Sequence, residues 1–225
     1  AVQESDDQGA MELYGNPTYR GVVFRNNYFC RIGKTGSEIA VHGQAGIRFD
    51  DAISGMVVYG NIFVRSANGH VGAIQINSGR DNVIERNWFY DCKQGVSGGW
   101  NPQNSVWRMM RSGGQPEDFY VDSLHLSRYP LLKSMLDEPG INNLWRNVFQ
   151  GCGRDLTGNR VHWDLIGNLL EGEGADGQGA VRRMRDPLRP DPALCDAIGF
   201  RPIPPEEIGL YPDPFRASWP PGRVE

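Results

Sequence analysis

The chain has 225 residues, of which 29 are Gly and 15 are Pro, a size and composition that fit one turn-rich globular domain. Its apolar runs span only a few residues, far below the roughly 20 that a membrane-spanning helix requires, so we expect no membrane partner. The formal net charge is −4, with 23 basic and 27 acidic residues, and we therefore expect no nucleic-acid partner.

Three segments near the start of the chain alternate apolar and polar residues with a period of two. They cover residues 9–15, 46–51 and 72–79, and a weaker copy covers 95–98. This period is typical of half-buried β-strands. Because no amphipathic helix separates these short strands, they favour a parallel β-solenoid over a βαβ fold.

A second pattern follows, in which an apolar stub precedes one Asn and two apolar or aromatic residues. Its successive copies are 34, 26, 60 and 21 residues apart. Three of these separations match a solenoid repeat, and the longest one contains an insertion. An antiparallel sandwich is the alternative, but it does not explain why the same Asn returns. The repeated residues are Asn27, Asn61, Asn87, Asn147 and Asn168.

Stacking explains the repeated Asn. Equivalent positions of a solenoid lie about 4.8 Å apart, so side-chain amides can bond to one another along the axis. We also expect these Asn residues to adopt the left-handed backbone that a tight corner demands. Cys92 and Cys152 each follow a repeated Asn by five positions. We expect them to stack as buried apolar groups, and a disulfide between them stays open.

Two regions lie outside the repeat. Residues 98–141 read as an insertion that includes a helix-compatible stretch, 117–135, interrupted by Pro130. Residues 186–225 hold 10 of the 15 Pro and predict an extended tail packed on the body. The domain organisation that we expect is therefore a β-domain over 1–185, with its insertion, followed by the tail.

The motifs as a whole resemble those of the right-handed parallel β-helix superfamily typified by pectate lyases and polygalacturonases. The chain is most similar to a bacterial branch of secreted β-helix repeat proteins. The segments that carry the likeness include 6–10, 25–29, 60–63, 79–87, Tyr129-Pro130 and 198–216. The resemblance implies an all-β, right-handed parallel β-helix of about five coils and a secreted or periplasmic location.

Members of that branch are several hundred residues long, so the resemblance implies that this chain begins inside the helix. An open end of a β-helix exposes a strand edge and an apolar interior. We therefore expect either further N-terminal coils or a self-associating partner to cover that end. No signal-like apolar segment precedes the first strand, so we expect that any export signal has either been removed or lies outside this sequence.

Aligning the three strands by their Gly starts assigns the direction of each side chain. Ile47, Phe49 and their equivalents point inward, whereas two columns point outward. Phe49→Ala should therefore cost about 3–5 kcal/mol, and the outward Arg48 should be replaceable for under about 1 kcal/mol. The outward columns are Glu12, Arg48 and Gln75, and then Tyr14, Asp50 and Asn77.

By the resemblance, this outward face is where β-helix sugar enzymes bind their chains. Its polar side chains suit a polysaccharide or oligosaccharide, although a solvated sheet face has a similar composition. His42 and His70 lie in loops at the mouth of this face. The predicted substrate-binding residues are Arg48, Tyr14, Gln75, Asn77, His42 and Trp100.

Two carboxylates on this face have a spacing that suits glycoside hydrolysis. Glu12 and Asp50 are diagonal neighbours, which places them roughly 7–8 Å apart. Inverting glycosidases need about 6.5–9.5 Å. Asp51 and Asp7 are alternative acids, because a turn can direct either of them outward. The leading hypothesis is therefore a glycoside hydrolase that requires no cofactor.

A calcium-dependent polysaccharide lyase is the second hypothesis. Asp6, Asp7, Asp50 and Asp51 form an oxygen-rich set that could hold Ca²⁺, as the resemblance to β-helix lyases implies. The third hypothesis is a glycan-binding or structural β-helix without catalytic activity, because this architecture hosts all three classes.

Overall fold

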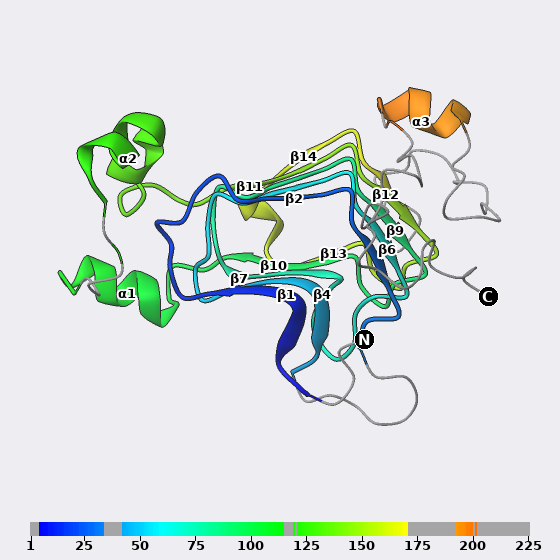
Figure 1. The fold of residues 1–225 in the computed structure, drawn as a ribbon, viewed down its shortest axis with the longest axis horizontal. Helices are drawn as coiled ribbons and strands as arrows, with labels where there is room; N and C mark the ends of the chain where they lie inside the picture. The colour runs from blue at the N-terminus through cyan, green and yellow to red at the C-terminus, as the bar shows by residue number, and fades with distance from the viewer. Residues whose placement is uncertain are drawn as a thin grey trace, which may run out of the picture.

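The computed structural model describes residues 5–33, 42–114, 119, 121–170, 192–199 and 201. This part of the chain is mostly β, with three parallel five-stranded sheets and few helices (Figure 1). The arrangement is compatible with the all-β parallel solenoid that the repeat predicts. No described helix is long and apolar enough to cross a membrane.

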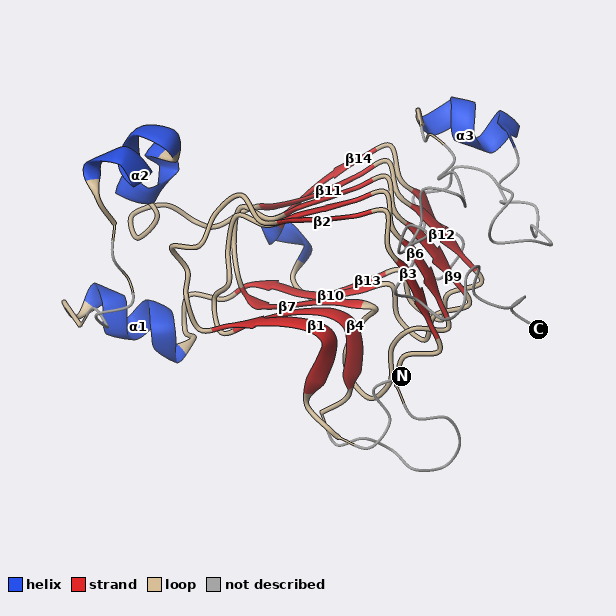
Figure 2. Cartoon of the chain, viewed as in Figure 1, coloured by secondary structure: helices blue, strands red, loops and turns tan. Residues whose placement is uncertain are grey.

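Each sheet takes every third strand of the chain, as Figure 2 makes visible. Sheet A consists of β1 (Gln8–Tyr14), β4 (Gln44–Asp50), β7 (Ile74–Ser78), β10 (Val96–Trp100) and β13 (Leu156–Thr157). Sheet B consists of β2 (Val23–Arg25), β5 (Val57–Tyr59), β8 (Val83–Glu85), β11 (Asn142–Trp145) and β14 (Trp163–Ile166). Sheet C consists of β3 (Tyr28–Cys30), β6 (Ile62–Val64), β9 (Trp88–Tyr90), β12 (Val148–Gln150) and β15 (Leu169–Leu170). We call three consecutive strands, one from each sheet, a rung.

The register of sheet A agrees with the alignment made from the sequence. Arg48 pairs with Glu12 on one side and with Gln75 on the other, and Phe49 lies between Leu13 and Ile76. Phe49 is fully buried, as predicted, and so are the inward residues of β7. The weak fourth copy in the sequence is β10, which pairs in parallel with β7. The period of two therefore assigned the faces of these strands correctly.

Aromatic rings stack through the core behind sheet C. The rings of Phe29, Phe63, Phe89 and Phe149 lie nearly parallel, with centroids 4.5–4.9 Å apart. Stacked rings at this spacing add to the free energy gained by burying their area. Cys92 and Cys152 are buried in adjacent rungs, and their thiols are free. Hydrogen bonding to Cys92 and burial together raise the pKa of the Cys152 thiol.

The five repeated Asn residues form one continuous ladder at the corner between sheets B and C. The Asn61 Nδ2 donates to Asn87 Oδ1 at 2.9 Å, and the Asn87 Nδ2 donates to Asn147 Oδ1 at 3.1 Å. Each acceptor oxygen also receives the backbone N–H of the preceding Asn, as in Asn61 N to Asn87 Oδ1 at 2.9 Å. The remaining Nδ2 bonds go to backbone carbonyls such as Val58 O. The ladder thus satisfies polar groups that would otherwise be buried without partners.

The expectation that these Asn residues adopt the left-handed backbone is wrong. The residue before each ladder Asn has the positive φ instead, between 52° and 63° at Gly60, Arg86, Arg146 and Gly167. One left-handed residue is enough to turn the chain between two sheets. The next residue then keeps an ordinary backbone, and its amide points along the stack.

Two helices and a 3₁₀ turn lie between β10 and β11, within the predicted insertion. They are α1 (Ser105–Arg111), α2 (Ser123–Arg128) and η1 (Pro130–Lys133), and a further 3₁₀ turn, η2 (Arg160–His162), precedes β14. The fully buried Trp107 anchors α1 to the sheets, because its Nε1 donates to Ser78 O at 2.7 Å. The sequence predicted helix over 117–135 and missed α1.

Most of the predicted tail lies outside the described residues. Within it, residues Pro192–Ile198 form helix α3 rather than an extended segment. Pro is favoured in the first turn of a helix because its missing N–H has no intrahelical acceptor there. The positive φ of Gly199 then ends the helix.

Replacing Asn87 by Ala should lower the free energy of unfolding by about 2–6 kcal/mol, because at least two buried groups lose their partners at about 1–3 kcal/mol each. Asn27→Ala is the matched control at the partly buried end of the ladder, where the described contacts of Nδ2 are to Asn61 Oδ1 and Arg25 O. It should cost about 1 kcal/mol. Urea unfolding measures the free energy of unfolding of both variants. Equal losses would show that an Asn inside the ladder contributes no more to stability than the Asn at its end.

Candidate functional site

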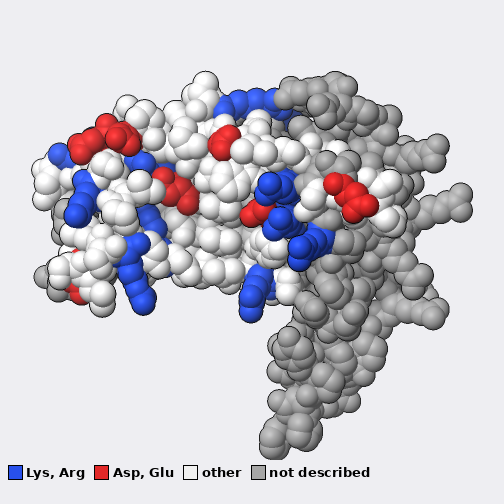
Figure 3. All heavy atoms as spheres, turned by 90° about the horizontal axis from the view of Figure 1, so that it is seen from above, with Lys and Arg blue, Asp and Glu red and all other residues white. Residues whose placement is uncertain are grey.

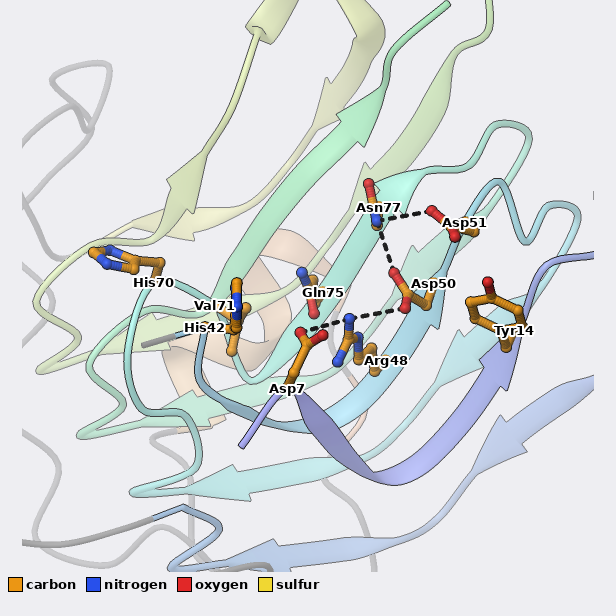
Figure 4. Close-up of a pocket in the computed structure, with 10 residues that line it drawn as sticks. All are labelled: Asp7, Tyr14, His42, Arg48, Asp50, Asp51, His70, Val71, Gln75 and Asn77. Atoms are coloured by element: carbon orange, nitrogen blue, oxygen red, sulfur yellow. Dashed lines mark hydrogen bonds and ion pairs between the residues drawn. The ribbon is translucent and has the colours of Figure 1, made fainter. Parts of the chain in front are cut away.

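A polar cavity of about 560 Å³ lies on the outward face of sheet A (Figure 4). Strands β1, β4 and β7 supply half of its lining residues, and the turns next to these strands supply the other half. The lining residues are Asp7, Tyr14, His42, Arg48, Asp50, Asp51, His70, Val71, Gln75 and Asn77. Alternation along three strands in register thus gathers polar groups that are far apart in the sequence.

Arg48 is the centre of the site. Its Nη2 contacts Asp7 Oδ1 at 2.7 Å and Asp50 Oδ2 at 2.8 Å, while its Nε lies 3.9 Å from Glu12 Oε1. Arg48 is only 4% exposed and Asp50 only 8%, although both point away from the core. Arg48 points outward, as the sequence predicts, but it is buried, because alternation gives the direction of a side chain and not what covers it.

Asn77 connects two of the carboxylates. Its Nδ2 donates to Asp50 Oδ1 at 2.7 Å and lies 3.3 Å from Asp51 Oδ1. Asp50 therefore accepts bonds from Arg48 on one oxygen and from Asn77 on the other. This carboxylate is held in one orientation at the floor of the cavity, as Figure 4 shows.

Asp51 follows β4 at a left-handed position, with φ of 42°. The equivalent turn position is Gly15 in the first rung and Ser78 in the third, and both also have positive φ. Asp tolerates this conformation better than most residues, and here the turn directs its carboxylate toward the cavity. The negative charge of Asp51, and its hydrogen bond with the phenol, raise the pKa of the exposed Tyr14.

Asn104 reaches the same carboxylate from the insertion. Its Oδ1 accepts from Val106 N at 2.9 Å and caps α1, while its Nδ2 donates to Asp51 Oδ1 at 3.0 Å. One side chain thus ends a helix and fixes a cavity residue. The sequence contains the capping pattern of Asn before a helix, but nothing in it indicates the contact with a turn 53 residues away.

The turns before β4 and β7 supply His42 and His70. The His70 N–H donates to His42 O at 3.1 Å, so the two turns stack on each other. Asp6 accepts the backbone N–H groups of His42 and Gly43, at 3.2 and 2.8 Å. Figure 4 places both imidazoles at the end of the cavity opposite Tyr14.

Eight of the predicted site residues line the cavity, and three others do not. Glu12 contacts the site only through Arg48, and its Oε2 accepts the Gly9 N–H at 2.9 Å. Trp100 lies at the end of β10, where its ring is 5.0 Å from that of His162. Asp6 instead accepts the backbone N–H groups of His42 and Gly43, in the turn before β4. Val71 and Asn104 are the residues that sequence reasoning missed.

The predicted calcium ligands have other contacts in this structure. The Arg48 guanidinium lies between Asp7 and Asp50, and Asp6 binds backbone N–H groups. Across the described ranges, no three or more His, Cys, Asp and Glu side chains are grouped so that they could hold a metal ion.

Comparisons of the chain with family models, with curated proteins and with solved structures found no match. The site is therefore interpreted from its own geometry.

Replacing Arg48 by Met should lower the free energy of unfolding by about 3–5 kcal/mol, because it leaves the buried Asp50 without its cation. Urea unfolding measures the loss. The double variant Arg48→Met, Asp50→Asn should recover part of it, since the amide removes the unpaired charge. A loss under about 1 kcal/mol for the single variant would instead agree with a solvated surface arginine.

Proposed function

We propose that the chain is a carbohydrate-active parallel β-helix protein, specifically a glycoside hydrolase that acts on a polysaccharide in the cavity of sheet A. The proposal includes the finer fold, a right-handed helix of about five coils, and a secreted or periplasmic location, both of which rest on the resemblance. The observation that carries it is the convergence of three carboxylates, one guanidinium and two amides on one cavity of about 560 Å³.

The polar lining suits a sugar better than an apolar ligand. Hydroxyl groups both donate and accept hydrogen bonds, and the lining offers carboxylates, carboxamides, a phenol and a guanidinium. Val71 is the one aliphatic side chain among these residues. Tyr14, 67% exposed, offers a ring face on which a sugar can pack.

We assign proton transfer to Asp51, and binding of the substrate to Asp7. Asp51 is oriented by Asn77, Asn104 and the Tyr14 phenol, so its carboxylate is held in one position as a base requires. The Asp7 side chain is 50% exposed and contacts Arg48 through one oxygen, which leaves the other open to a group of the substrate. Asp50 and Arg48 form the floor that keeps these groups apart from the core.

Asp51→Asn tests the assignment, because it preserves shape while removing the charge that a base must carry. Turnover of a glycan that the parent protein cleaves should fall about 100- to 10,000-fold, with little change in unfolding. Asp137→Asn is the matched control, since Asp137 is exposed in the insertion. Reducing-end release measures activity. Full activity of Asp51→Asn would place the chemistry elsewhere.

Other variants distinguish the alternatives. Glu12→Gln should reduce turnover only mildly under this assignment, because Glu12 does not line the cavity; a collapse would favour the Glu12–Asp50 pair of an inverting hydrolase. Unsaturated products and a calcium requirement would favour the lyase. Binding to glycans without any turnover would favour the non-enzymatic β-helix.

Asn104→Ser separates positioning of Asp51 from helix capping. Ser is also a good N-cap, so the free energy of unfolding should change by under about 0.5 kcal/mol, but the donor to Asp51 is lost. We expect kcat to fall about 10- to 100-fold with little change in KM, as for supporting hydrogen bonds around reactive groups. A proportional loss of stability and activity would mean that Asn104 only caps α1.

A further inference from the structure

The cavity contains three carboxylates and a single guanidinium, and that guanidinium is already engaged. The Arg48 Nη2 contacts Asp7 and Asp50 together, and Arg48 is more than nine-tenths buried. A carboxylate on a ligand would have to displace one of these partners to reach Nη2. It would also face Asp51 at short range without a counter-ion. Like-charge contacts of this kind oppose binding of an acidic sugar.

Several polar atoms of the lining have no hydrogen-bond partner among the described residues. The Gln75 carboxamide makes no such bond there, and its Oε1 is buried. The second oxygen of Asp7 is likewise open. The buried Nε of Arg48 lacks an acceptor, since Glu12 Oε1 is 3.9 Å away. A fitting ligand therefore presents donors to Asp7 and to Gln75 Oε1, and acceptors to Arg48 Nε and to the Gln75 amide N–H groups.

An ammonium group supplies three donors and no acceptor, and a neighbouring hydroxyl supplies the acceptor. Charge-assisted hydrogen bonds from ammonium to carboxylate are roughly twice as strong as neutral ones. The exposed end of the cavity also carries negative charge, because the Asp51 carboxylate lines it beside Tyr14.

Negative charge is a local property of this cavity. On the face seen in Figure 3, Lys and Arg side chains lie beside Asp and Glu. Ion pairs elsewhere have at least one cation for each carboxylate: Arg65 contacts Asp91 at 2.8 Å, and Glu85 contacts both Arg146 at 3.1 Å and Arg86 at 3.4 Å. The excess of carboxylates over cations is therefore a feature of the cavity and not only of the net charge.

We propose, building on the proposed function, that the cavity selects an amino sugar with a free, protonated amine. The ammonium would contact Asp7 and Gln75, and a hydroxyl would accept from Arg48. The inference goes beyond sugar hydrolysis, because it ranks substrates: amine-bearing residues first, N-acetylated or neutral residues next, and uronates last.

The test is an array of oligosaccharides in matched forms that share backbone and linkage and differ only in one substituent: free amine, N-acetylated amine, hydroxyl or carboxylate. Binding of the whole chain is measured at a pH where the amine is protonated, with product analysis in parallel. We expect the amine form to bind at least tenfold tighter than its N-acetylated partner, and the preference to weaken as salt is added. Asp7→Asn should remove most of the preference, whereas Asp137→Asn should retain it.

Equal or tighter binding of the uronate or neutral forms would overturn the amino-sugar inference and leave the proposed function standing. An amine preference that Asp7→Asn does not change would also overturn it, since it would then reflect general attraction to an acidic protein. No binding and no turnover of any form would instead reject the proposed function, and the substrate inference with it.

Discussion

The amide ladder at the corner of sheets B and C is the constraint on which the rest of the structure depends. Each ladder Asn bonds to the next rung through both its side chain and the backbone, so adjacent rungs can meet in only one register. A slip of one residue would leave buried amides unpaired, which costs far more than any single side-chain contact. The ladder therefore aligns not only its own corner but also sheet A, which lies across the core from it.

Alignment of sheet A is what assembles the cavity. Arg48 can reach Asp7 and Asp50 together because its strand is held in register with β1, and Asn77 reaches Asp50 and Asp51 because β7 is held in register with β4. Each strand supplies only one or two of these groups. The chemistry that we propose thus depends on a hydrogen-bond network at another corner of the same rungs.

The sequence predicted the parts of this structure that periodicity controls. The alternation of apolar and polar residues predicted that Phe49 points inward and Arg48 outward. The repeated Asn predicted the rungs and the position of Cys92 and Cys152 in adjacent rungs. The sequence did not predict burial of Arg48, which depends on what lies over the sheet, or the role of Asn104, which depends on where the insertion packs. The sequence also did not predict which residue at each corner has the left-handed backbone, because either the Asn or the residue before it could make the turn.

The ladder tolerates very different lengths of chain between its members. Asn87 bonds to Asn147 with the same geometry as Asn61 bonds to Asn87, although 60 residues separate the first pair and 26 the second. The ladder therefore sets no fixed length for the segment between β10 and β11, which through Asn104 touches Asp51. In this architecture, new specificity can be acquired by replacing one loop, while the sheets that carry the carboxylates stay constant.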